Sequence, residues 1–178
     1  MAGISKISMR KVIATMGIAL IALLPGSFAA AQVGEPTVLV LVRHAEKASD
    51  GTRDPSLSTE GIERARRLSN VLRDIGLAAV FVSDTRRARE TAAPIVASLG
   101  VVAEEYPGRD VAALLDRILK DHAGKTVLVI GHSNTVPEMI STLTAGREAV
   151  VLRDDEYDAM FIVTLGNRTS PTVLRLRY

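Results

Sequence analysis

The chain has 178 residues, 47% of them hydrophobic, which is enough for one globular domain with a core of its own. It contains no cysteine, which excludes disulfides, thiol nucleophiles and cysteine-ligated zinc. Its formal charge of +2 and its 3% aromatic content give little support to nucleic-acid binding, which relies on basic and stacking side chains.

Residues 1–31 have the three-part pattern of a secretory signal peptide: a basic start, an apolar run at 12–24, and small residues that end at Ala31. We expect cleavage before Gln32 and export to the periplasm or the medium, without stable membrane insertion. The apolar run of 13 residues is short of the roughly 20 that span a membrane, so an uncleaved anchor is the alternative. Because this segment holds three of the 22 basic residues and none of the 20 acidic ones, the remainder carries −1, and no nucleic-acid partner is expected.

The mature chain is predicted to begin with a linker at 32–36, followed by a single domain at 37–178. Residues 37–42 form a β-branched and leucine-rich run, which is typical of a strand buried on both faces. His44 follows this strand almost directly. The chain therefore places a histidine just beyond a predicted strand end.

A polar loop at 50–58 leads into the first predicted helix, with Ser58 or Thr59 as its N-cap. Gly76 is a fitting C-terminal stop for this helix. Its buried face is predicted from apolar residues at helical spacing, namely Ile62, Ala65, Leu68, Leu72 and Ile75.

The middle of the chain alternates strands and helices. Residues 79–82 are predicted to be a strand and 83–100 a loop that enters a helix, which either begins shortly before Pro94 or is kinked there. Residues 101–106 indicate a third strand. A further helix is predicted from apolar residues on one face, with Gly124 as its end: Val111, Leu114, Leu115, Ile118 and Leu119.

Residues 126–130 are the clearest buried strand, and His132 follows it. A helix is expected over about 135–144, and two more strands over 160–165 and 173–177. Alternating strands and helices predict an α/β fold with a three-layer, mainly parallel sheet flanked by helices, with the last two strands as a hairpin at one side. Ligands of such sheets bind beyond the carboxyl ends of the strands, which is where both histidines lie.

Four motifs follow one another along the chain. They are Arg43-His44-Ala45-Glu46-Lys47, then Asp54-Pro55-Ser56-Leu57-Ser58 with Gly61, then the segment from Ser83 to Ala92, then Gly131-His132-Ser133. These motifs resemble, in the same order, those of the histidine phosphatase superfamily, whose fold is phosphoglycerate mutase-like. The RHAEK run with a signal peptide ahead of it is similar to one short branch of that family.

The resemblance implies that His44 is the nucleophile and becomes phosphohistidine, while Arg43, Arg87 and His132 bind the phosphoryl oxygens. Of the neighbouring arginines, Arg87 has the family's spacing. The chemistry agrees, because phosphoryl transfer needs charge stabilisation, which a planar guanidinium provides, and a neutral imidazole can attack phosphorus.

The proton donor has no clear motif. Glu105 and Asp110 are candidate general acids, and an acidic cluster at 154–158 is an alternative or a solvated turn. Ser133 and Asn134 precede a helix, whose free backbone N–H groups favour an anion, so both are candidate substrate-binding residues. Glu46 is a third such candidate.

We therefore expect a metal-independent phosphoric monoester hydrolase without a cofactor, since the arginines would repel a metal cation. Its expected partner is a phosphorylated small molecule or a phosphoprotein, including protein phosphohistidine. A phosphomutase of the same superfamily and a non-catalytic phospholigand-binding module are the alternatives, with a metal-dependent hydrolase as a third. The sequence leaves the physiological substrate and the oligomeric state open.

Overall fold

A computed structural model describes residues 34–166 and 169–178. The predicted signal peptide and its cleavage site lie outside the described residues. Within those residues the chain forms, in order, β1 (Thr37–Arg43), α1 (Thr59–Leu72), β2 (Leu77–Ser83), α2 (Arg86–Leu99), β3 (Ala103–Tyr106), α3 (Val111–Asp121), β4 (Thr126–Gly131), α4 (Thr135–Leu143), β5 (Ala159–Leu165) and β6 (Thr172–Arg177). No helix in this part of the chain is long and apolar enough to cross a membrane.

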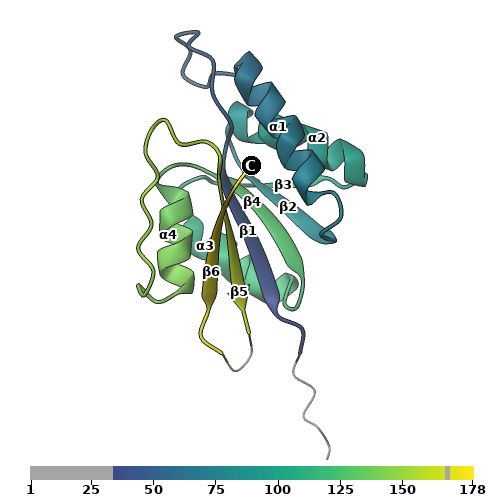
Figure 1. Ribbon diagram of the computed structural model, residues 1–178, viewed down its shortest axis with the longest axis vertical. Coiled ribbons are helices and arrows are strands. Elements are labelled where there is room, and N and C mark those ends of the chain that lie inside the picture. The colour runs from purple at the N-terminus through teal and green to yellow at the C-terminus, as the bar shows by residue number, and fades with distance from the viewer. Residues whose placement is uncertain (1–33, 167–168) are drawn as a thin grey trace, which may run out of the picture. The chain divides into compact units, whose positions relative to one another are not determined.

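The described strands form one sheet in the order β3-β2-β4-β1-β5-β6 (Figure 1). The first four strands in this order run parallel to one another. β5 pairs antiparallel with β1, and β6 pairs antiparallel with β5. The predicted mainly parallel sheet with a hairpin at one side is confirmed.

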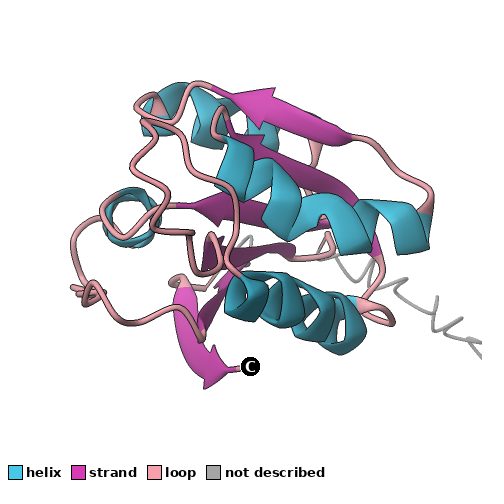
Figure 2. Cartoon of the chain, turned by 90° about the horizontal axis from the view of Figure 1, so that it is seen from above, coloured by secondary structure: helices cyan, strands magenta, loops and turns pink. Residues whose placement is uncertain are grey.

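Helices cover both faces of the sheet, which gives the predicted three layers (Figure 2). Along β1, Leu39 and Leu41 are fully buried in one core with residues of α3 and α4. Val40 and Val42 alternate with them and pack in a second core with residues of α1 and α2. Each such side chain stabilises the fold by about 1.5–3 kcal/mol through its burial, so both faces hold β1 in place.

The helices differ from the sequence expectation in one boundary and in one buried face. α2 begins at Arg86, well before Pro94, which lies inside the helix. The predicted buried face of the first helix also differs. Ile62 of α1 and Ile75, which lies beyond the end of α1, are exposed at 45% and 39%, because the side chains that face the sheet are those of Ala65, Leu68 and Leu72.

The strand register brings three strand ends to the same edge of the sheet. Val42 of β1 is paired with Ile130 of β4, and Ile130 is paired with Val82 of β2. The residues that follow these three strands therefore emerge side by side, although they come from distant parts of the chain. This edge carries the candidate site.

Candidate active site

His44 lies just beyond the end of β1 and is 4% exposed. Its backbone N–H donates to the carbonyl oxygen of Gly131, which extends the pairing of β1 with β4 by one residue. Its ring Nδ1–H donates to the carbonyl oxygen of Ala45 across 2.8 Å. Because the proton is held on Nδ1, the lone pair of the imidazole is on Nε2.

Arg87, in the first turn of α2, contacts that lone pair directly. Its Nε donates to Nε2 of His44 across 3.0 Å. Thr91 of the same helix accepts from the backbone N–H of Ala45 and donates to the carbonyl oxygen of Arg87. The hydroxyl of Thr91 therefore links the helix that carries the arginine to the loop that carries the histidine.

The other arginines near the start of α2 point elsewhere. Arg86 pairs with Glu90, and Arg89 pairs with Glu105. The carboxylate of Asp54 accepts from the backbone N–H of Arg86 and lies 3.4 Å from a guanidinium nitrogen of Arg87. The structure thus brings Arg87, and not its neighbours, to His44.

Arg43 is buried and held by the loop that precedes β5. Its Nη1 donates to the carbonyl oxygens of Arg153, Asp154 and Glu156 at 3.0–3.3 Å. Its guanidinium lies 4.0 Å from the ring centroid of Tyr157, a cation–π contact. These contacts fix a charged side chain that burial would otherwise destabilise.

His132 follows β4 and faces His44, with 5.2 Å between the ring centroids. Its backbone N–H donates to the hydroxyl of Thr135, the first residue of α4. The four residues named by the sequence motifs, Arg43, His44, Arg87 and His132, thus come together at the carboxyl edge of the sheet.

Both histidines are neutral at pH 7. Burial, aided by the charges of Arg87 and Arg43, lowers the pKa of His44 to about 3, although its hydrogen bond to Ala45 opposes this shift. Burial and the charge of Arg87 lower the pKa of His132 to about 4, against the opposing charge of Asp84. A neutral imidazole with its lone pair on Nε2 is the form that can attack phosphorus.

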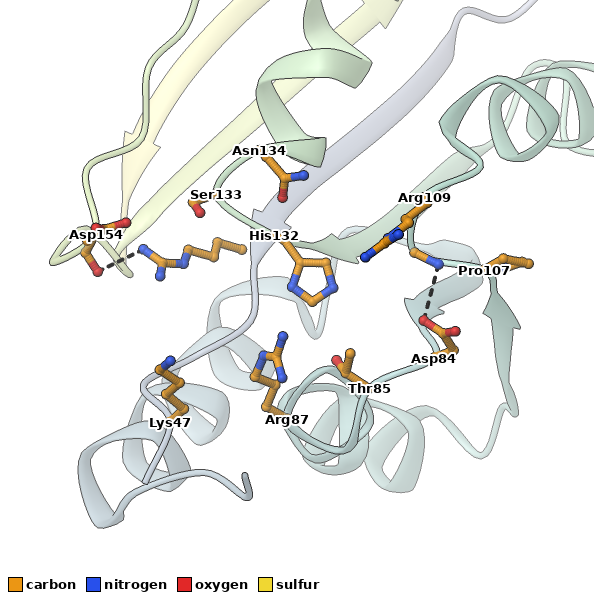
Figure 3. A pocket seen from close by; sticks show the side chains of 12 residues that line it. Lys47, Asp84, Thr85, Arg87, Pro107, Arg109, His132, Ser133, Asn134 and Asp154 are labelled. Atoms are coloured by element: carbon orange, nitrogen blue, oxygen red, sulfur yellow. Dashed lines mark hydrogen bonds between the residues drawn. The ribbon is translucent and has the colours of Figure 1, made fainter. Parts of the chain in front are cut away.

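An open cavity of about 610 Å³ borders three of these four residues, Arg43, Arg87 and His132, whereas the buried His44 is not among its lining residues (Figure 3). Its walls come from the ends of β1, β2 and β4 and from the loop between β3 and α3. It is lined by Arg43, Lys47, Asp84, Thr85, Arg87, Pro107, Gly108, Arg109, His132, Ser133, Asn134 and Asp154.

A profile of the histidine phosphatase superfamily (branch 1) matches residues 39–109, which include Arg43, His44 and Arg87. This segment of the chain is therefore similar to the histidine phosphatase superfamily. His132 lies beyond the matched segment, so its place beside His44 is an observation of the structure. A search of curated proteins gave no significant match.

Solved structures of phosphatases share the fold of this chain. The protein histidine phosphatase SixA complexed with tungstate is 25% identical, with a TM-score of 0.66 over 79% of this chain and 96% of the other. The alpha-ribazole phosphatase of Shigella flexneri is 16% identical, with a TM-score of 0.64 over 79% and 96%. Mycobacterial glucosyl-3-phosphoglycerate phosphatase is 14% identical, with a TM-score of 0.59 over 81% and 99%. The family profile and the 25% identity to a protein histidine phosphatase support a phosphatase, and so a hydrolase, whereas the other two structures show the fold alone.

The two carboxylates proposed from the sequence as general acids do not line the cavity of this phosphatase. Glu105 is exposed and pairs with Arg89. Asp110 is the N-cap of α3 and accepts from the backbone N–H of Ala113. Both are occupied by local contacts of the β3–α3 region.

Asp84 and Asp154 are the carboxylate residues that line the cavity within the described chain. Asp84 directly follows β2 and accepts from the backbone N–H of Gly108 across 3.1 Å. Its position beyond a strand end is the same signal that pointed to the two histidines, and it could have identified Asp84 from the sequence. Arg109, which sequence reasoning also missed, lies on a loop with no such signal.

Two of the three candidate substrate-binding residues line the cavity and one does not. Ser133 and Asn134 line the cavity at the start of α4, as the sequence suggested. Glu46 does not, because its half-buried carboxylate pairs with Arg64 of α1. Glu46 therefore anchors the first helix to the loop after β1.

A metal would need several ligating side chains in one place. Among the described residues there is no group of three or more histidines and carboxylates that could hold a metal ion. The cavity is instead lined by His132, with His44 beside it, and by the guanidinium groups of Arg43, Arg87 and Arg109, which suit an anion better than a cation.

Proposed function

We propose that this phosphatase removes the phosphoryl group of a phosphomonoester, or of a phosphohistidine on another protein, through a covalent phosphohistidine on His44. The observation that carries the proposal is the state of His44: a neutral ring, with its proton held by the carbonyl of Ala45 and its lone pair facing the guanidinium of Arg87. A phosphoryl group that enters between Nε2 and Arg87 meets a nucleophile on one side and a positive charge on the other.

In the first step Nε2 of His44 forms a bond to phosphorus while the bond between phosphorus and the leaving group breaks. The leaving atom takes a proton from a donor or from water. In the second step water attacks the phosphorus and the P–N bond breaks, which releases inorganic phosphate and restores neutral His44. The proton of the attacking water passes to a base or to solvent.

Negative charge on the phosphoryl oxygens is balanced by groups from three strand ends. Arg43 and Arg87 supply guanidinium groups, and His132 together with the free N–H groups at the start of α4 supplies further hydrogen-bond donors. Asp84 lies on the cavity wall, which favours it over Glu105 and Asp110 as the residue that transfers the proton.

The experiment that tests the proposal is isolation of the phosphoenzyme. Wild-type protein treated with a labelled aryl phosphate and quenched with alkali is expected to retain a base-stable, acid-labile label, and His44→Ala is expected to retain none. His122→Ala is the matched control, because His122 lies outside the cavity against Phe81. Turnover by His44→Ala would refute the nucleophile assignment, and loss of turnover in a chelator would refute metal independence.

An open cavity that admits a side chain of another protein supports phosphohistidine proteins as substrates. The 25% identity to a protein histidine phosphatase is a second support. We also propose export, on the pattern of residues 1–31. N-terminal sequencing of the protein recovered from outside the cytoplasm is expected to begin at Gln32, and an intact Met1 would contradict cleavage.

A further inference from the structure

The cavity holds more positive charge than the proposed phosphoryl site uses. It is lined by Arg43, Lys47, Arg87 and Arg109 against the carboxylates of Asp84 and Asp154. Arg43 and Arg87 belong to the phosphoryl site described above. Lys47 and Arg109 are exposed, and within residues 34–166 and 169–178 neither has a carboxylate partner at ion-pair distance.

Arg109 lies close to His132, on a loop whose backbone hydrogen-bonds to Asp84. Asp84 accepts from the N–H of Gly108 and donates its own N–H to the carbonyl oxygen of Tyr106. A Cβ on Gly108 would lie 3.5 Å from Nε2 of His132, at ordinary van der Waals contact, so this loop lies directly beside the histidine. Arg109, the next residue, therefore lies beside the phosphoryl position.

Lys47 is fixed on a second wall, on the opposite side of His132 in the view of Figure 3. Its backbone forms a bridge with Leu57, and the flanking Ala48 and Glu46 hydrogen-bond to Ser56 and Ser58. This short ladder ties the loop after His44 to the start of α1. The two unpaired cations thus flank the cavity on backbone that other contacts hold in place.

The lining offers little for an apolar ligand, because Pro107 is its one wholly apolar side chain. Recognition of a substrate there depends on charge and hydrogen bonds. We propose that the substrate carries a second anionic group, a carboxylate or a further phosphate, beside its phosphoryl group, and that Lys47 and Arg109 bind it. This inference rests on the proposed function, since it takes the phosphoryl group to lie at His44.

The test compares two esters of the same shape, 3-carboxyphenyl phosphate and 3-carbamoylphenyl phosphate, which differ in the charge of one substituent. Wild type is expected to prefer the carboxylate ester in kcat/KM by about tenfold at low salt, and less at high salt because exposed charges are screened. The double variant Lys47→Gln/Arg109→Gln is expected to lose this preference. The single variants apportion it between the two cations.

Lys120→Gln is the matched control, because Lys120 is exposed on α3 and outside the cavity. It is expected to keep the preference in full. A wild type that does not distinguish the esters, or a double variant that still prefers the carboxylate, overturns the inference.

Binding measured by calorimetry separates this inference from the proposed function. Both esters are titrated into His44→Ala, with and without the double substitution, so that no turnover is needed. If wild type hydrolyses neither ester, the proposed function fails while calorimetry still decides the subsite. Tighter binding of the carboxylate ester that depends on Lys47 and Arg109 supports the subsite, and equal binding of the two esters refutes it.

Discussion

Nε of Arg87 donates a hydrogen bond to Nε2 of His44 across 3.0 Å, so a guanidinium occupies the face of the ring from which the lone pair projects. The two residues come from different elements, α2 and the end of β1, and the hydroxyl of Thr91 links those elements. The positive charge that a phosphoryl group needs is therefore already beside the nucleophile before any substrate arrives, and the substrate must replace this hydrogen bond to reach the lone pair.

Substitution of Arg87 is expected to cost about 3–4 kcal/mol of transition-state stabilisation, measured as kcat/KM of Arg87→Ala on an aryl phosphate. Arg87→Lys is expected to recover only part of this loss, because an ammonium cannot present the planar pair of donors. Arg86→Ala is the matched control, since Arg86 pairs with Glu90 outside the cavity. A greater loss in Arg86→Ala than in Arg87→Ala would overturn the assignment.

The two site histidines are expected to stay neutral far below the usual range of histidine. Burial lowers the pKa of His44 to about 3 and that of His132 to about 4. Nitrogen NMR of the ligand-free protein should show both rings in the neutral form at pH 5, with the single N–H proton of His44 on Nδ1. A protonated His44 ring at pH 5, or a proton on its Nε2, would contradict the geometry.

The same histidines make stability depend on pH. In the unfolded chain each has a pKa near 6.5, whereas in the folded protein the values are about 3 and about 4. Between pH 6.5 and pH 4 the unfolded state therefore binds protons that the folded state does not. The free energy of unfolding should fall on the order of 5 kcal/mol as the pH decreases through this window, with both histidines contributing, and level off below the folded pKa values. Denaturant titration measures this, and His132→Asn should show a smaller slope.

Gly61→Ala is expected to destabilise the protein, although this change usually stabilises a helix by about 1 kcal/mol. An added Cβ on Gly61 would lie 2.2 Å from the backbone oxygen of Glu46, so α1 or the loop after His44 must move. We expect a loss of about 2 kcal/mol or more in the free energy of unfolding, measured with urea. A stabilised Gly61→Ala would show that this packing is looser than the structure indicates.

Glu156→Gln is expected to lower activity through Arg43. The buried carboxylate of Glu156 pairs with Arg175 and Arg177 of β6, which hold its pKa below the usual range against the opposing effect of burial. Its backbone carbonyl, with two others of the same loop, accepts from Arg43. Because the two arginine partners are half exposed, we expect a modest loss of stability, about 1–2 kcal/mol, and a severalfold loss of kcat/KM.

Asp158→Asn is the control for this positioning role. Asp158 also pairs with Arg177, but its carbonyl accepts from Tyr178 and not from Arg43. It should lose stability without a matching loss of kcat/KM. Equal activity losses in the two variants would show that the effect of Glu156 is only structural.

The sheet and the four central residues could be predicted from the sequence because the order of strands and helices along the chain determines where the strand ends lie. Buried strands are visible as apolar runs, and parallel strands end at a shared edge, so His44 and His132 had to be near one another. The resemblance supplied Arg87, which helix periodicity alone does not distinguish from Arg86.

The absence of Glu105 and Asp110 from the cavity could not be predicted, because it depends on the path of a loop. Both residues lie near the right strand in sequence, but residues 107–109 between them line the cavity, and each carboxylate has a local partner. The role of Glu46 likewise depends on its ion pair with Arg64, which forms because α1 packs beside the loop after β1. Long-range contacts of charged side chains leave no periodic signal in a sequence.

β1 is the first strand of the described chain, yet both of its neighbours, β4 and β5, come from the second half. A growing polypeptide therefore contains His44 early, whereas the two strands that flank β1 are synthesised late. The carbonyl oxygens that hold Arg43 arrive only with residues 153–156. A fragment that ends near Arg109 contains the whole segment matched by the family profile, with His44 and both arginines, and is expected to be inert. We therefore expect no chemistry from a chain that ends before the loop at 153–156.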